Sequence, residues 1–243
     1  VYDSSADAVA LDTETTCLYP RDGFVLGLSM SYKENHGRYI LTDILDERHL
    51  TLTQAILDKY TIVFHNMKFD YKMISYHLGL VFNRANVEDT MLMHYALDEN
   101  DSHGLKPLAL KYTDYGDYDY ELDAFKKQYC AEHNINVDDF TYDLIPFDIL
   151  SSYASIDTAV TYELFMKFWP VIQKNDKLLW VYNNLLIPGT LFLMDMEEEG
   201  IPIASDRMAG AGKYLNTWIE DALNKVYSFP EVQTYERAVN TRF

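Results

Sequence analysis

Hydrophobic and polar positions in the first half of the chain switch repeatedly between strand-like and helix-like spacing. Short apolar runs end at turn residues, and segments with apolar positions three and four apart follow them. From the apolar runs we predict strands over residues 8–12, 24–32, 37–42 and 61–65. From the helical spacing we predict helices over residues 51–58, 68–78 and 89–97, and one or two helical turns over 105–112.

The order of these segments predicts a mixed sheet with helices on its faces, and therefore an α/β fold. Short turns separate the first three strands, which favours an antiparallel meander. Thr51 or Thr53 is the expected cap of the first helix. Gly79 follows the second helix, where a glycine commonly ends a helix.

The pattern changes after residue 98. Two acidic, tyrosine-rich stretches, 114–123 and 136–143, are expected to form solvated loop and short helix, with a substrate-guiding role as the alternative. A helix is predicted over 147–168, broken or kinked at Pro170. A long helical pattern over 175–199 is interrupted at Pro188 and Gly189, and Ser205 is the expected cap of a last helix ending near Tyr227. We place a boundary near residues 171–175, which gives a domain over 1–172 and a helical segment over 173–243.

Composition narrows the class of protein. Hydrophobic residues make up 48% of the 243, so a packed core is expected. No apolar run approaches the ~20 residues of a membrane helix, and the start of the chain does not read as a signal peptide. The two cysteines fit a reducing compartment, and we expect a cytoplasmic protein. Because the chain begins with Val1 and not Met, we expect a fragment or a processed chain.

The formal net charge of −18 argues against a protein that grips DNA by its own basic surface. It does not exclude a nuclease, because metal ions supply local positive charge and a partner domain can supply a basic groove. Asp12 and Glu14 lie two apart at the end of the first predicted strand, so their side chains project from one face. Two adjacent carboxylates repel each other unless a cation lies between them, and a divalent ion is the obvious candidate.

Three further acidic or hydroxyl side chains complete a candidate site. Asp70 falls in the first turns of the helix that follows a buried strand. Tyr153 and Asp157 lie four apart on a predicted helix and therefore share one face. Each of these motifs alone has an ordinary explanation: exposed acidic alternation, a helix cap, or a buried tyrosine beside a solvated aspartate. Together, and in this order, they indicate a carboxylate site for hard divalent ions.

Such a site suits phosphodiester cleavage. Two Mg²⁺ or Mn²⁺ ions about 3.5–4 Å apart activate the attacking water and stabilise both charged oxygens of the displacement. These ions prefer carboxylate oxygens and water as ligands, which is the donor set here. A tyrosine can orient the water through a hydrogen bond, since metal binding already lowers the pKa of that water.

The segments LDTET at 11–15, HNMKFD at 65–70 and YASID at 153–157 resemble the three motifs of the DEDD 3′–5′ exonucleases. A tyrosine four residues before the last aspartate is similar to the tyrosine branch, since Ser152 stands where the other branch has histidine. Residues 104–112 and 186–203 resemble the family A DNA polymerases, the latter at the start of their thumb. The resemblance implies a ribonuclease H-like mixed β-sheet flanked by helices, followed by a helical extension.

The resemblance also implies roles for individual residues. The metal ligands would be Asp12, Glu14, Asp70 and Asp157, holding two divalent cations, and Tyr153 would orient the water. Contacts to the substrate would come from Thr13, Leu18 and Asn66. The cations Arg21, Lys68, Lys72 and Lys106 are possible phosphate contacts, although surface solvation is the expected role for each.

By this resemblance the chain is the proofreading part of a family A DNA polymerase that trims single-stranded or frayed DNA 3′ ends. The polymerase active site does not fit before Phe243, so the palm and fingers are the expected partners, and the chain is expected to be a monomer without membrane contact. One alternative is a stand-alone exonuclease of the same branch that trims RNA. Another is a catalytically silent nuclease fold that serves as a binding module, which the presence of all four carboxylates disfavours.

Overall fold

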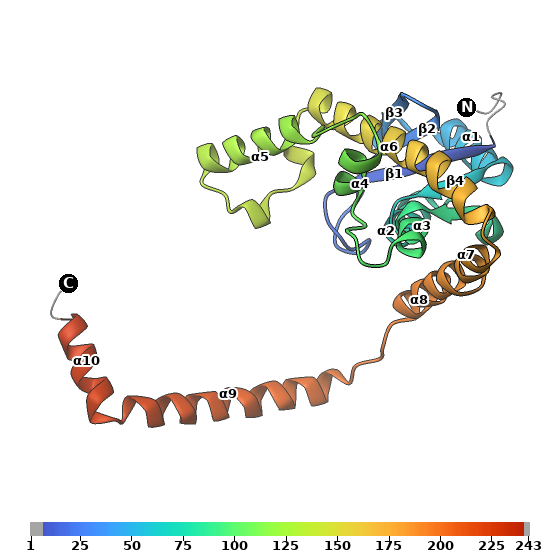
Figure 1. Ribbon diagram of the computed structural model, residues 1–243. Coiled ribbons are helices and arrows are strands. Elements are labelled where there is room, and N and C mark those ends of the chain that lie inside the picture. Colours follow the sequence, from blue (N-terminus) through green and yellow to red (C-terminus); the bar gives the residue numbers. More distant parts are fainter. Residues whose placement is uncertain (1–6, 241–243) are drawn as a thin grey trace. The chain divides into compact units, whose positions relative to one another are not determined.

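The computed structural model describes residues 7–240 (Figure 1). The chain divides into two compact units, Val1–Met196 and Glu197–Phe243. The first unit contains one five-stranded sheet with the order β3-β2-β1-β4-β5. Its strands are β1 (Ala8–Thr15), β2 (Val25–Lys33), β3 (His36–Leu41), β4 (Thr61–Phe64) and β5 (Val87–Asp89). β1, β2 and β3 form an antiparallel meander, whereas β4 and β5 run parallel to β1, which confirms the predicted mixed sheet.

Helices cover both faces of this sheet, and β1 contacts both layers. Val9 and Leu11 face the core formed with α1 (Glu47–Lys59) and α2 (Met67–Leu78). Ala8 and Ala10 face the core formed with α3 (Thr90–Leu97), α4 (Leu105–Tyr112) and α6 (Phe147–Gln173). Because strand side chains alternate between faces, Asp12 and Glu14 continue the side of Ala8 and Ala10, toward α6.

α6 lies across β1, β2 and β3 (Figure 1), and a glycine permits part of this close approach. A Cβ atom added to Gly37 of β3 would lie 1.7 Å from the carbonyl oxygen of Ser155 in α6. No side chain fits in that space without moving the helix. Gly37 therefore lets the helix that carries Tyr153 and Asp157 lie directly on the sheet.

The predicted start of α1 is wrong, whereas the predicted end of α2 is confirmed. α1 begins at Glu47, and its cap is Asp46, whose carboxylate accepts the backbone N–H of His49 at 2.9 Å. The expected cap at Thr51 or Thr53 is therefore wrong. The first three residues of the helix are polar, so the apolar pattern did not mark where the helix begins. α2 ends at Gly79 with φ +64°, as predicted.

The acidic, tyrosine-rich region is more ordered than its sequence indicates. It contains α5 (Tyr120–His133), which has 14 residues, and the short 3₁₀ turns η3 (Val137–Asp139) and η4 (Tyr142–Leu144). Its apolar side chains form a third buried cluster with the start of α6, made of Leu122, Cys130, Phe140, Ile145 and Leu150. The predicted loop and short helix are found over 114–123 and 136–143, whereas the helix over residues 124–133 was not predicted. Two further 3₁₀ turns, η1 (Thr42–Ile44) and η2 (Arg84–Asn86), lie in connections elsewhere.

The prolines of the second half do not end helices where predicted. α6 continues past Pro170 and ends at Gln173. Pro170 has no N–H group, so it removes one backbone hydrogen bond in the last turns of the helix. α7 (Asp176–Val181) passes through a π-helical turn, Tyr182–Leu186, into α8 (Ile187–Glu199). The irregularity is this wider turn, directly before Pro188, and not an interruption at Pro188 and Gly189. A proline ring clashes with the carbonyl one turn back, and the wider turn relieves that clash.

The second unit consists of α9 (Ser205–Tyr227) and α10 (Pro230–Asn240). Ser205 is the first residue of α9 and Ala204 the cap position, so the expected cap is wrong. The helix α10 was not predicted. The expected division at residues 172 and 173 stays a prediction about separate domains, since the first compact unit extends to Met196. Within residues 7–240, no helix has the length and apolar character needed to span a membrane.

Candidate active site

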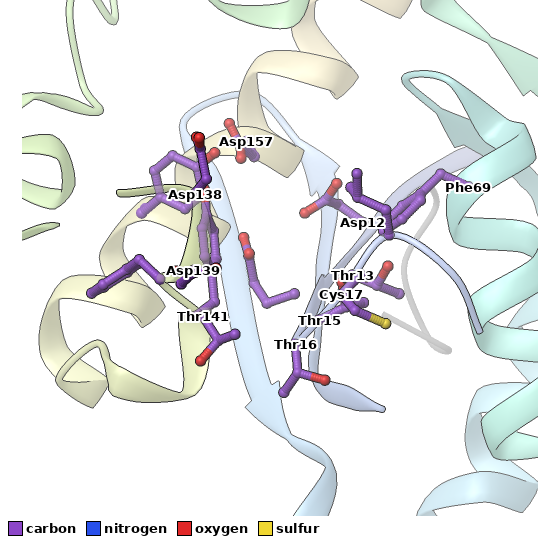
Figure 2. Close-up of a pocket in the computed structure, with 15 residues that line it drawn as sticks. Asp12, Thr13, Thr15, Thr16, Cys17, Phe69, Asp138, Asp139, Thr141 and Asp157 are labelled. Carbon is purple, nitrogen blue, oxygen red and sulfur yellow. Dashed lines mark hydrogen bonds between the residues drawn. The ribbon is translucent and has the colours of Figure 1, made fainter. Parts of the chain in front are cut away.

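Three carboxylates meet at the end of β1. Asp12, Glu14 and Asp157 each offer an oxygen atom, and these oxygens all lie within 4.8 Å of one another. β1 presents the first two on the face that α6 covers, and α6 contributes the third. Glu14 and Asp157 are buried, whereas Asp12 is half-buried. Figure 2 shows Asp12 and Asp157 facing each other across the site.

A cavity of about 550 Å³ opens over this cluster. One wall is the loop after β1, including Thr16, Cys17 and Leu18, together with Phe69 of α2. The other wall is the segment 138–142, which carries Asp138, Asp139 and Thr141 (Figure 2). Leu18 is 75% exposed and lines this cavity, so an apolar side chain is available to a ligand there.

Asp70 lies outside this group of three. It belongs to α2, and its Oδ1 accepts hydrogen bonds from the backbone N–H of Thr13 at 2.9 Å and from the Thr13 hydroxyl at 2.6 Å. Thr13 points to the opposite face of β1 from Asp12 and Glu14, so Asp70 reaches the site from behind the strand. Its charge is still near enough to raise the pKa of Asp12.

All four carboxyl groups have pKa values raised mainly by burial. Burial raises the pKa of Asp12, and repulsion from Asp70, Glu14 and Asp157 raises it further. Burial raises the pKa of Glu14 and Asp157 as well. Burial also raises the pKa of Asp70 to about 7, against the lowering effect of its two hydrogen bonds from Thr13. Ionising these groups together is therefore unfavourable without added positive charge.

Lys106 supplies such a charge, contrary to its expected place on the solvated surface. Its Nζ lies 2.6 Å from Oδ1 of Asp157, and it sits over the rings of Tyr118 and Tyr153 at 3.9 and 4.0 Å. The Tyr118 hydroxyl donates a hydrogen bond to the same carboxylate oxygen. From the sequence, Lys106 was named only as a possible phosphate contact, and Tyr118 was not singled out. A lysine in the first turn of a predicted helix was the available signal for Lys106, whereas Tyr118 had none.

Tyr153 lines the cavity beside the carboxylates. Burial, followed by the charges of Asp157 and Glu14, raises the pKa of its phenol. Tyr142, on the opposite wall, has its pKa raised to about 12 by burial. Both phenols therefore stay protonated near neutral pH and act as hydrogen-bond donors, which suits the predicted role of Tyr153 in orienting water.

Asn66 precedes α2 with φ +68°, and its side chain makes no capping hydrogen bond. The cap is Asp89, whose buried carboxylate accepts the backbone N–H groups of Met67 at 2.7 Å and Met91 at 2.8 Å. It also accepts those of Asn66 at 3.3 Å and Leu92 at 3.2 Å. One carboxylate thus holds the starts of α2 and α3, and the Asn66 side chain stays available to a ligand.

Tyr182, which lies in the π-helical turn after α7, is hydrogen-bonded to Asp89, the residue that caps α2 and α3. Its side chain is fully buried, and its hydroxyl accepts the backbone N–H of Asp89 at 2.9 Å. The hydroxyl donates to Glu88 Oε2 at 2.7 Å, while burial raises the pKa of Glu88 to about 7. The segment after α6 is therefore bonded to the residue that caps α2.

Comparison with known proteins decides the family. A family model described as 3′–5′ exonuclease matches residues 2–173. The chain belongs to this exonuclease family. The predicted family is confirmed, and the matched range includes Asp12, Glu14 and Asp157.

Relatives of this exonuclease include DNA polymerases. It is 49% identical over 250 residues to the DNA polymerase of Escherichia phage T5, covering 100% of this chain and 29% of the phage protein. It is 30% identical over 205 residues to DNA polymerase I of Borreliella burgdorferi, covering 81% of this chain and 21% of that protein. The chain thus spans less than a third of the curated relatives it matches.

Solved structures show the same fold at low identity. The exonuclease matches the POL domain of Pol1 from M. smegmatis in complex with DNA primer-template and dNTP, with a TM-score of 0.58 and 19% identity over 93% of this chain and 34% of that one. It matches Brucella melitensis NrnC bound to pGG with a TM-score of 0.59 and 18% identity, over 82% of this chain and 91% of that one. The predicted ribonuclease H-like fold is confirmed.

Proposed function

We propose that this exonuclease removes nucleotides from single-stranded or frayed DNA 3′ ends, as the proofreading part of a family A DNA polymerase. The observation that carries the proposal is the group of three carboxylates within 4.8 Å of one another beneath an open cavity. The relatives support DNA as the substrate, because they are DNA polymerases of phages and bacteria. The natural partner is then the remainder of the polymerase, in the cytoplasm of a bacterium or of a phage-infected host, and the chain itself is a monomer.

The family uses divalent metals, and the donor set fits a hard ion. The oxygens of Asp12, Glu14 and Asp157 converge, and raised pKa values mark three groups that need a cation to ionise together. We assign one Mg²⁺ or Mn²⁺ to these three residues and a second to Asp12 with Asp70. When bound, the ions supply an activated water and stabilise the charge that develops on the phosphate.

The other residues act on the water and the nucleic acid. Tyr153 donates a hydrogen bond that orients the attacking water, and its protonated state excludes a role as base. Leu18, Thr13 and Asn66 contact the 3′-terminal nucleotide, with Leu18 against the base. Exposure of Leu18 at the cavity and the uncommitted Asn66 side chain support these assignments.

The decisive experiment follows the product ladder from a 5′-labelled single strand. Asp12→Ala combined with Glu14→Ala abolishes 3′-end trimming while the fold persists, because relief of carboxylate repulsion does not cost stability. Asp138→Ala combined with Asp139→Ala is the matched control, since these residues line the same cavity outside the cluster and trimming should continue. Trimming at the wild-type rate by the Asp12 and Glu14 variant refutes the assignment.

RNA trimming is the second candidate, since the likeness to Brucella NrnC covers 91% of that chain. Matched single strands of DNA and RNA separate the two, and the proposal requires faster trimming of DNA. The silent binding module is tested by the same assay. Trimming that depends on Mg²⁺ or Mn²⁺ and stops with a chelator excludes it.

A further inference from the structure

Lys106 places a positive charge within the carboxylate cluster of the exonuclease site. Its Nζ contacts Oδ1 of Asp157 at 2.6 Å, and its side chain is 29% exposed while that of Asp157 is 7% exposed. The rings of Tyr118 and Tyr153 lie 3.9 and 4.0 Å from the ammonium. The ammonium is thus held by one ion pair and two aromatic faces, an arrangement that favours a partly desolvated cation.

The charge of Lys106 acts on the whole cluster. It lowers the pKa of Asp12, Glu14 and Asp157, against the larger effect of burial on each. A single ammonium therefore offsets part of the repulsion among three buried carboxylates. Its four-carbon stem is flexible, so the same charge can leave the cluster without a change in the backbone of α4.

We propose that Lys106 is the resident counter-ion of the exonuclease site, and that it is exchanged for the divalent cation when the metal binds. The inference rests on the proposed function, because it requires that Asp157 is a metal ligand. A carboxylate oxygen already paired with an ammonium at 2.6 Å is a poor ligand for a second cation, since the two positive charges repel each other at that distance. Lys106 therefore holds Asp157, Tyr118 and Tyr153 in place before the metal arrives, and it weakens metal binding in return.

Removal of the Lys106 charge should make metal binding tighter. Without the ammonium, the three carboxylates present a more negative site to an incoming ion. The wild-type chain must break the Lys106–Asp157 ion pair before the ion binds, and the variant has no such pair to break, so we expect about tenfold tighter metal binding for a partly exposed pair. A lysine that only anchors α4 would leave metal affinity unchanged or would weaken it by disordering the site.

The test is a Mn²⁺ titration of the full 243-residue chain without DNA, followed by electron paramagnetic resonance of the free ion. Lys106→Met should bind Mn²⁺ about tenfold more tightly than the wild-type chain. Lys106→Arg keeps the charge and should stay within about threefold of wild type. Lys111→Met is the matched control, because Lys111 lies on the same helix and pairs with Asp101, outside the cluster, and its affinity should equal wild type. Equal or weaker binding by Lys106→Met overturns the inference.

Asp157→Asn separates this inference from the proposed function. If Asp157→Asn abolishes Mn²⁺ binding while Lys106→Met leaves it unchanged, the metal site stands and the exchange does not. If the wild-type chain binds no Mn²⁺, both fail.

A second measurement needs no variant, and it decides the question if Lys106→Met does not fold. Brief acetylation of the wild-type chain, read by mass spectrometry, should modify Lys106 faster when Mn²⁺ is present, because the released ammonium leaves its ion pair. Lys111 should react equally with and without metal. An unchanged rate at Lys106 contradicts the exchange.

Discussion

Replacement of Asp70 by asparagine should make the metal-free protein more stable at alkaline pH. Asp70 is buried, and both of its hydrogen bonds come from Thr13, through the backbone N–H and the hydroxyl. An asparagine Oδ1 can accept both bonds in the same position, so the substitution removes a charge and keeps the contacts. The predicted gain therefore reports the cost of ionising Asp70 within the fold.

The size of the gain follows from the pKa. Burial raises the pKa of Asp70 from an ordinary value of 3.8 to about 7. Between these values the folded state keeps a proton that the unfolded state has released, so the free energy of unfolding falls as pH rises. The loss is complete above pH about 7 and amounts to about 4 kcal/mol at most. Asp70→Asn should exceed wild type by this amount at pH 8, and the difference should vanish toward pH 4.

Urea unfolding in the presence of a chelator, at pH 4.5, 6 and 8, measures this difference. Asp195→Asn is the control, because this exposed aspartate pairs with Arg84 and the pairing lowers its pKa. Asp195→Asn should show no gain as pH rises. Added Mg²⁺ should stabilise wild type more than Asp70→Asn, since binding to the folded state alone raises the free energy of unfolding. If Asp70→Asn is no more stable than wild type at pH 8, the electrostatic reasoning about the site is wrong.

Three further substitutions test the site and its support. Tyr153→Phe should slow trimming by about 10–100-fold in a labelled-strand assay, less than carboxylate loss, because one hydrogen bond to the water is removed; a loss equal to that of the carboxylate variant would contradict this role. Asp89→Ala should lower the urea-unfolding free energy by about 2–4 kcal/mol, because two helices lose their shared cap; a loss below about 0.5 kcal/mol would count against the cap. Gly37→Ala should cost about 3 kcal/mol in the same measurement, because its Cβ would overlap the Ser155 carbonyl; an unchanged midpoint would show that α6 can move away freely.

The sheet, and the convergence of three of the four carboxylates that were predicted to hold metal, could be inferred from sequence because the positions of these residues depend on local periodicity. Alternation along β1 put Asp12 and Glu14 on one face, and helical spacing put Asp157 on the side of α6 that meets them. The same alternation places Thr13 on the opposite face, which explains why Asp70 is bonded there and lies outside the group of three. The roles of these residues stay predictions until they are tested.

Sequence reasoning failed where a contact depends on the reach of a long side chain, and where a helix has few buried apolar positions. Lys106 and Tyr118 reach Asp157 from segments 51 and 39 residues away, and no periodicity marks either side chain as inward-facing. α5 buries only Leu122 and Cys130 along its length, too few apolar positions to distinguish a helix from acidic loop. The start of α1 was misplaced because Asp46 and the threonines further along are all possible caps, whereas Ser205 was taken as a cap because the true cap position of α9 holds Ala204, which has no capping side chain.

The π-helical turn determines where the chain can be shortened without loss of buried side chains. A chain cut at the family border, residue 173, would lose Tyr182 and Met194, both of which are buried in the same compact unit as the sheet. Their removal would open two hydrophobic cores to water and leave the Asp89 N–H without its hydroxyl acceptor. We therefore expect a chain that ends at Met196 to be more stable than one that ends at residue 173, because it keeps both of these buried side chains.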